Sequence, residues 1–140
     1  MRAVGAGGGS MGRPDGLDRG RVGSVWLAGS VDISELADRA ERISARYGEH
    51  LGIERDGDWF LLKLQEELGE LTQSYLQVTG RARTKGLSSE EIREDFELEF
   101  ADVLCQLLLL ARHHKVDVPA AVERKWLIRE AQLSDPDARF

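Results

Sequence analysis

The chain is 140 residues long, which corresponds to a single domain. Hydrophobic residues make up 41% and charged residues 31%, a balance typical of globular proteins, and the formal net charge is -6. An acidic chain of this size is a poor general binder of nucleic acid or anionic membranes, so neither is expected as a partner. The single cysteine, Cys105, excludes an intramolecular disulfide and a CxxC zinc site. The N-terminus lacks the apolar core of a signal peptide and no apolar run is long enough to span a membrane, so the sequence predicts a cytoplasmic protein.

Residues 1–30 differ in composition from the rest of the chain. They contain 9 of the 15 glycines, including those of the run Gly7-Gly8-Gly9-Ser10. Such a composition is typical of flexible linkers and offers too little apolar material for a core. We therefore expect a flexible N-terminal arm over residues 1–30 and one folded domain over residues 31–140.

The first two predicted helices each begin at an aspartate. Apolar residues recur at helical spacing from Asp32 onward, and Asp32 is positioned to cap a helix that ends near Tyr47. Glycines and aspartates over residues 48–57 indicate a connection. Asp58 is then predicted to cap a second helix, which reaches about Val78.

Two further helices complete the predicted fold. A basic loop over residues 80–87 precedes Ser88, which forms a capping box with the glutamate three positions later and starts the longest helix, ending near His114. Asp117 is predicted to cap a fourth helix that fades near Leu133. No strand-like alternation occurs in these segments, so the sequence predicts an all-α fold, a four-helix bundle.

The third predicted helix is too apolar for a small monomer. Between Phe100 and Ala111 the only polar residues are Asp102 and Gln106. A helix that is apolar nearly all round must be covered on several sides, and three neighbouring helices leave part of it open. A second copy of the chain is the simplest cover, so we expect a homodimer or a dimer of dimers, which is a tetramer.

Two pairs of carboxylates each lie one helical turn apart. Glu67 and Glu70 belong to the second predicted helix, whereas Glu99 and Asp102 belong to the third. Like charges at this spacing destabilise an isolated helix, and a carboxylate in an apolar segment is costly without a partner. Mg²⁺, with Mn²⁺ as a substitute, would offset both effects. Because one loop joins the two helices, they would be antiparallel neighbours with a metal site between them.

The same residues have a simpler interpretation as a solvated acidic surface. Clusters such as Glu66, Glu67 and Glu70 are common on exposed helix faces. Asp102 and Gln106 would then form a thin polar line that faces water on the third helix. The two interpretations differ in whether carboxylates from the two helices meet.

The acidic motifs resemble those of a known family. Residues Glu66–Glu70 (EELGE) followed by Glu99–Asp102 (EFAD) resemble the EExxE…ExxD signature of the MazG-like all-α nucleoside triphosphate pyrophosphohydrolases. Residues Lys125–Arg129 (KWLIR) are similar to the basic KFxRR-type segment on the last helix of that family, with Ile128 in place of its first arginine. The resemblance covers residues 32–132.

The resemblance implies a reaction and a set of acidic site residues. The reaction is hydrolysis of a nucleoside triphosphate, NTP or dNTP, between its α- and β-phosphates to give a monophosphate and pyrophosphate. Glu67, Glu70, Glu99 and Asp102 would be the Mg²⁺ ligands. Glu66 would be the general base for the attacking water, or an outer-sphere ligand.

The resemblance also implies contacts with the phosphates and the base. Lys125 and Arg129, from the same or a partner subunit, would bind the phosphates. Lys63, one turn before the glutamates, is a further candidate for the phosphates, and its alternative role is an ion pair with those glutamates. Trp59 is a candidate for stacking on the base, although an aromatic residue at this spacing is also typical of a core.

Two other functions are compatible with the sequence. A catalytically silent relative would bind nucleotide or metal as a regulatory helical dimer. A plain dimerisation module would carry the glutamates on its surface without a ligand. The presence of all five acidic positions argues against a silent relative, while nothing in the sequence identifies the base or the sugar.

Overall fold

The computed structural model describes residues 32–133, and the expected arm at residues 1–30 lies outside them. The elements in chain order are α1 (Ile33–Leu51), α2 (Gly57–Val78), α3 (Ser89–His113), α4 (Val118–Lys125), the 3-10 turn η1 (Leu127–Arg129) and α5 (Glu130–Leu133). The described residues contain no strand, which confirms the prediction of an all-α fold. None of these helices is both long and apolar enough to cross a membrane.

Side-chain caps fix where the helices begin. Asp32 accepts a hydrogen bond of 2.8 Å from a backbone N–H in the first turn of α1. Ser88 and Glu91 form the predicted capping box at the start of α3. Asp117 caps α4 in the same way as Asp32 caps α1. These three predicted caps are confirmed.

The connection between α1 and α2 is shorter than predicted. α1 continues past Tyr47 to Leu51 and ends at Gly52, whose φ of 64° is a left-handed conformation that glycine adopts without strain. The predicted cap of α2 is wrong, because Asp56 rather than Asp58 accepts the backbone N–H of Trp59 at 2.8 Å. The sequence Asp-Gly-Asp offers two capping aspartates, and the first of them caps α2.

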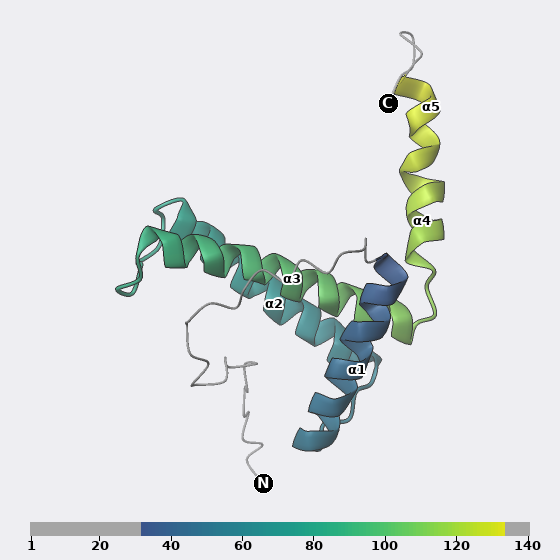
Figure 1. Cartoon of the computed structure of the whole chain (residues 1–140), viewed down its shortest axis with the longest axis horizontal. Coiled ribbons are helices and arrows are strands. Elements are labelled where there is room, and N and C mark those ends of the chain that lie inside the picture. Colours follow the sequence, from purple (N-terminus) through teal and green to yellow (C-terminus); the bar gives the residue numbers. More distant parts are fainter. Residues whose placement is uncertain (1–31, 134–140) are drawn as a thin grey trace, which may run out of the picture. The chain divides into compact units, whose positions relative to one another are not determined.

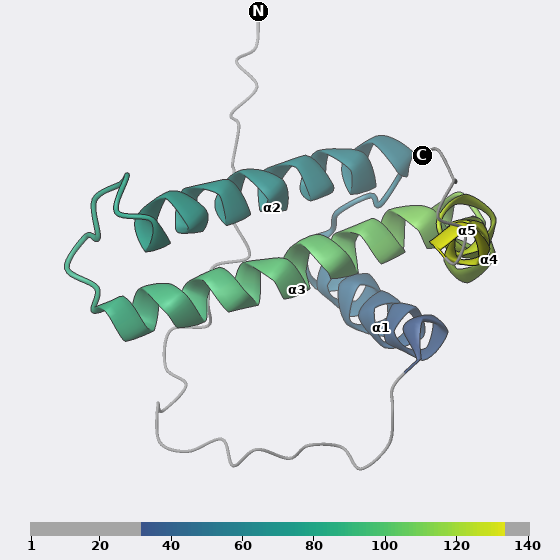
Figure 2. The ribbon, with the colours of Figure 1, turned by 90° about the horizontal axis from the view of Figure 1, so that it is seen from above.

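α2 and α3 lie side by side and antiparallel along most of their length, while α1 crosses α3 (Figures 1 and 2). The core lies where the three helices meet, and it consists of Ala40, Phe60 and Leu109, with Trp59 and Leu110 packed against it. This small core holds the two helices that carry the acidic motifs in a fixed register.

Arg55 attaches the connection between α1 and α2 to α1. Its guanidinium pairs with both carboxylate oxygens of Glu41, at 3.1 and 2.7 Å, and lies 4.9 Å from the ring centroid of Phe60. Gly48 makes room for this side chain, since a Cβ there would stand 2.6 Å from Arg55 Cδ. The start of α2 is therefore held by a partly buried arginine, to which no motif of the sequence points.

The fourth predicted helix is interrupted after α4, where Trp126 leads into η1. α4 contains no buried residue, and it contacts η1 more extensively than it contacts the other helices. Together with η1 and α5 it extends from the C-terminal end of α3 (Figure 1). We call these three elements, residues 118–133, the C-terminal arm, and below "the arm" refers to them alone. One chain thus packs three helices together, and the closed four-helix bundle stays a prediction.

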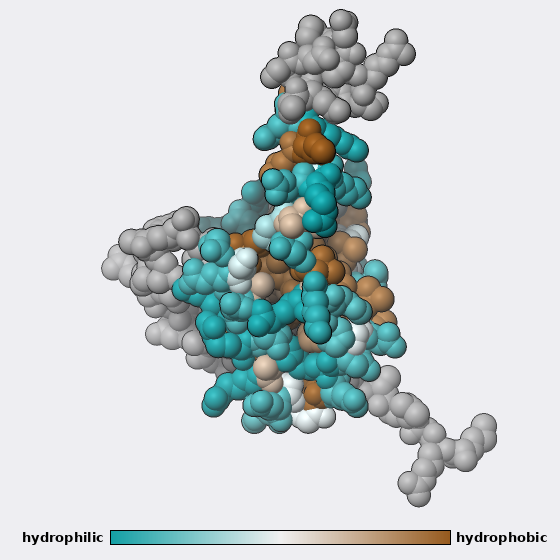
Figure 3. Space-filling view, turned by 90° about the vertical axis from the view of Figure 1, so that its right-hand side faces the viewer, coloured by the Kyte–Doolittle hydropathy of each residue, from teal (hydrophilic) through white to brown (hydrophobic). Residues whose placement is uncertain are grey.

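Large apolar side chains of the described residues are exposed more often than they are buried. On α3 they form a stripe, Phe100, Leu104 and Leu107, whose members are 40–54% exposed. We call these three residues the α3 stripe. Apolar side chains also lie open where the arm leaves the body and on the arm itself (Figure 3). The α3 stripe is therefore a candidate interaction surface.

Candidate metal and phosphate site

Three glutamates from two helices meet between α2 and α3. Glu67 and Glu70 lie one turn apart on α2, and Glu99 approaches from α3. Each offers a carboxylate oxygen, and the three oxygens lie within 4.8 Å of one another. We call these residues the glutamate triad. The simple interpretation of a solvated acidic surface does not fit Glu67, which is only 5% exposed.

The other two predicted acids lie at the edge of the glutamate triad. Asp102 is more exposed than the triad, and its charge contributes to the raised pKa of Glu70 and of Glu99. Glu66 is half-buried and accepts a hydrogen bond of 2.8 Å from Lys63 Nζ. All five acids of the two motifs therefore interact with one cluster, which we call the acid cluster.

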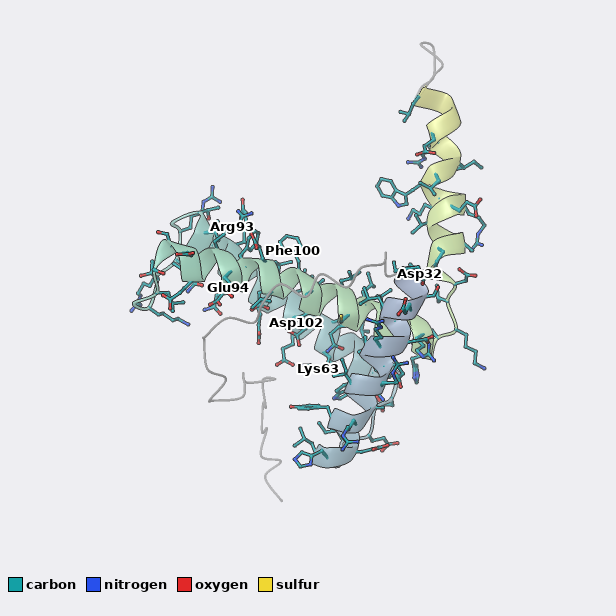
Figure 4. The ribbon with its side chains drawn as sticks, viewed as in Figure 1. Asp32, Lys63, Arg93, Glu94, Phe100 and Asp102 are labelled. Atoms are coloured by element: carbon teal, nitrogen blue, oxygen red, sulfur yellow. The ribbon has the colours of Figure 1, made fainter. Side chains whose placement is uncertain are left out.

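Lys63 supplies positive charge to the acid cluster. Its ammonium lies 2.8 Å from Glu66 Oε2 and 3.1 Å from Glu67 Oε1, and its side chain is 12% exposed. Its charge also opposes the upward shift in the pKa of Glu70 and of Asp102. Lys63 and Asp102 lie on the same side of the α2–α3 pair (Figure 4). The ion pair that the sequence analysis weighed for Lys63 is confirmed, and its phosphate contact stays a prediction.

Crowding of carboxylates shifts their proton affinities. Burial, followed by the charges of Glu70, Asp102 and Glu67, raises the pKa of Glu99 from 4.5 to about 7. Burial is also the main cause of the raised pKa of Glu70 and of Asp102. One oxygen of Glu99, Oε2, is buried and has no hydrogen-bond partner among the described residues. The cluster thus has only one lysine against five carboxylates, and one of its buried oxygens lacks a partner among the described residues.

The donor set fits a hard divalent cation. All three ligand atoms of the glutamate triad are carboxylate oxygens, which Mg²⁺ and Mn²⁺ prefer over softer donors. A cation would give the unpartnered Glu99 Oε2 a partner and would offset the repulsion that, together with burial, raises the pKa of Glu99. Glu67, Glu70 and Glu99 would hold such an ion, with Asp102 beside them.

We expect the metal-free protein to lose thermal stability as the pH rises from 4.5 to about 7. In this range folded Glu99 keeps a proton that unfolded Glu99 releases, so its contribution is fully present below the unfolded pKa and is lost as the pH passes the folded pKa. Glu70 and Asp102 act in the same direction. Calorimetric scans in chelator measure the trend. Saturating Mg²⁺ should abolish this loss of stability. A melting temperature that rises over this pH range in chelator would contradict the raised pKa of Glu99.

Lys125 and Arg129 are not brought to the acid cluster within one chain. Both are exposed on the arm, which begins beyond the C-terminal end of α3 at His113. Asp102 lies about 17 Å back along α3 from that end, given a rise of 1.5 Å per residue. Contact of these basic residues with the phosphates, from the same or a partner subunit, stays a prediction.

Trp59 lies at the edge of the core. Its ring is 5.1 Å from that of Phe60 in an edge-to-face arrangement, and the Arg55 guanidinium lies 5.9 Å from its centroid. These contacts explain the position of Trp59 without a ligand, and its stacking on a base stays a prediction. Gln106 was weighed as part of a water-facing line, but it is 4% exposed and its Oε1 has no partner among the described residues. The sequence shows Gln106 on the Asp102 face, whereas its burial depends on tertiary packing.

A hollow of about 370 Å³ lies away from the acid cluster, where the start of α1 meets the end of α3 and the start of α4. Ala37, Leu108 and Val116 are among its apolar lining residues, and Asp38 and Arg112 form an ion pair at its wall. No acid of the cluster lines it.

Comparison of the chain with protein-family models, curated proteins and solved structures finds no match.

Proposed function

We propose that the protein is a Mg²⁺-dependent nucleoside triphosphate pyrophosphohydrolase of the MazG-like type, with Mn²⁺ as an alternative ion. It would cleave NTP or dNTP between the α- and β-phosphates and serve sanitation or control of the nucleotide pool in the cytoplasm. The observation that supports this proposal most strongly is the meeting of Glu67 and Glu70 with Glu99, because these residues come from the two halves of the EExxE…ExxD motif.

The acid cluster can assist phosphate chemistry only with a cation. A triphosphate is repelled by five carboxylates, and bound Mg²⁺ would supply charge to the phosphate oxygens and acidify a water. The glutamate triad and Asp102 would hold the ion. Glu66, which is the more exposed of the two glutamates bound to Lys63, is positioned at the edge to accept the proton of the attacking water.

The α3 stripe supports assembly with a second copy. Phe100 projects from the opposite side of α3 to Asp102 (Figure 4), and Leu104 and Leu107 follow Phe100 at helical spacing. A partner can therefore cover the stripe without covering the carboxylates. A homodimer or a dimer of dimers through this stripe would also supply Lys125 and Arg129 from a partner subunit as candidates to bind the phosphates.

We expect Leu104→Glu to break this assembly, because it places a charge in the centre of the α3 stripe. Light scattering after size exclusion should give two or four times the mass of one chain for the wild type and a smaller assembly for the variant. Leu98→Glu is the matched control, since Leu98 is 51% exposed on α3 but lies off the stripe. An unchanged mass for Leu104→Glu would show that the stripe is not the interface.

Ligand-dependent thermal unfolding tests the proposed function against its alternatives. We expect Mg²⁺ together with a non-hydrolysable triphosphate analogue to raise the melting temperature, whereas the analogue in chelator does not. A plain dimerisation module would show no shift with any ligand. A shift without turnover of natural nucleotides would instead support the catalytically silent regulatory dimer.

A further inference from the structure

The ion pairs of Lys63 and the glutamate triad share one carboxylate. Lys63 Nζ lies 3.1 Å from Glu67 Oε1, and Glu67 is also a member of the triad. Both side chains are nearly buried, at 12% and 6% exposure. The ammonium is held by a second bond of 2.8 Å to Glu66, which is 38% exposed and lies at the edge of the acid cluster.

We propose that Lys63 is the resident counter-ion of the acid cluster and that a divalent cation displaces its ammonium from Glu67. This inference rests on the proposed function, since it takes the glutamate triad as the place where the cation binds. The contact of Lys63 with Glu67 would thus exist only in the metal-free protein.

Repulsion between the two cations and the flexibility of the lysine side chain favour displacement of the ammonium over binding of both cations to Glu67. A divalent ion at the triad would lie within a few ångströms of the Lys63 ammonium, and the two cations repel each other in a partly buried site. The divalent ion draws on three carboxylates, whereas the ammonium contacts two of the five. The lysine stem is flexible and its second partner, Glu66, lies at the edge of the cluster, so the ammonium can move outward without losing both partners.

Displacement would also prepare the site for its substrate. An ammonium that leaves Glu67 remains attached to α2 one turn from the cluster, where a metal-bound triphosphate would place its negative oxygens. The same lysine would then neutralise carboxylates without metal and phosphates with metal. Lys63 would thus serve both as an ion-pair partner of the glutamates and as a phosphate ligand, one after the other.

Chemical acetylation of the whole chain, read by mass spectrometry, tests this inference with Mg²⁺ alone as the probe. In chelator, Lys63 should react slowly because it is buried and paired; in saturating Mg²⁺ its labelling should rise by about fivefold, a typical coupling between two ligands of one site. Lys85 and Lys115 are exposed loop residues and should react equally in both conditions.

Calorimetric titration with Mg²⁺ provides the second measurement. Lys63→Met should tighten Mg²⁺ binding by about tenfold, because the competing ammonium is gone. Arg93→Met is the matched control: it removes one cation from a surface i,i+4 ion pair of α3 and should leave the affinity unchanged. If Mg²⁺ binds the wild type while Lys63 stays protected, the displacement is wrong and the metal site stands. If Mg²⁺ does not bind the wild type, the proposed function and this inference both fail.

Discussion

Glu99→Gln should abolish pyrophosphate release while making the metal-free protein more stable. Glutamine keeps the shape of the side chain but cannot supply the negative charge that Mg²⁺ requires, so we expect turnover to fall by at least about 100-fold. The same change removes a carboxylate whose pKa is raised to about 7 by burial and by its acidic neighbours, so repulsion within the metal-free cluster declines. Stability and activity should therefore change in opposite directions.

Glu97→Gln is the matched control for this prediction. Glu97 lies two positions away on α3, is 62% exposed and pairs with Arg93 on the surface. Its loss should leave turnover unchanged and alter the free energy of unfolding by less than about 0.5 kcal/mol. Melting temperatures in chelator and product release in Mg²⁺ are measured for both variants. If Glu99→Gln retained turnover within a few-fold of wild type, the site assignment would be wrong.

Phe60→Ala should destabilise the fold by about 3–5 kcal/mol, which is a large part of the stability of a small domain. Phe60 is buried in the core with Ala40 and Leu109, and it contacts the Arg55 guanidinium and the His113 ring as well. Few other large side chains are buried among the described residues, so little remains to compensate for the cavity.

Denaturant unfolding of Phe60→Ala and Leu62→Ala measures this effect. Leu62 lies two positions further along α2 and is 68% exposed, so its truncation should change the free energy of unfolding by less than about 0.5 kcal/mol. Equal losses in the two variants would show that the meeting point of α1, α2 and α3 is not the core. Because Phe60 fixes α1 on the helices that carry the acids, its loss should also weaken Mg²⁺ binding.

Local features of the fold could be predicted from the sequence. The caps at Asp32, Ser88 and Asp117 are set by residues within one turn, and the structure has all three. The cap of α2 was misplaced because Asp56 and Asp58 compete over a single glycine. Capping propensity is the same for both residues, so the sequence does not distinguish them.

The glutamate triad could be predicted from the sequence, but its surroundings could not. Spacing alone placed Glu67 beside Glu70, and the antiparallel pairing of two adjacent helices placed Glu99 opposite them. The burial of Gln106 and the position of α4, which carries Lys125, were not predictable, because they depend on how the helices pack and on the direction in which α4 leaves the end of α3. Helical periodicity carries no information about either.

Phosphorus NMR of the wild-type protein with a panel of canonical and modified NTPs and dNTPs measures the proposed reaction itself. Spectra are recorded in Mg²⁺, in Mn²⁺ and in chelator. We expect monophosphate and pyrophosphate to appear together, only when the divalent ion is present, and the ranking of substrates to identify the preferred base and sugar. Release of orthophosphate instead, or product formation that persists in chelator, would contradict the proposed pyrophosphohydrolase activity.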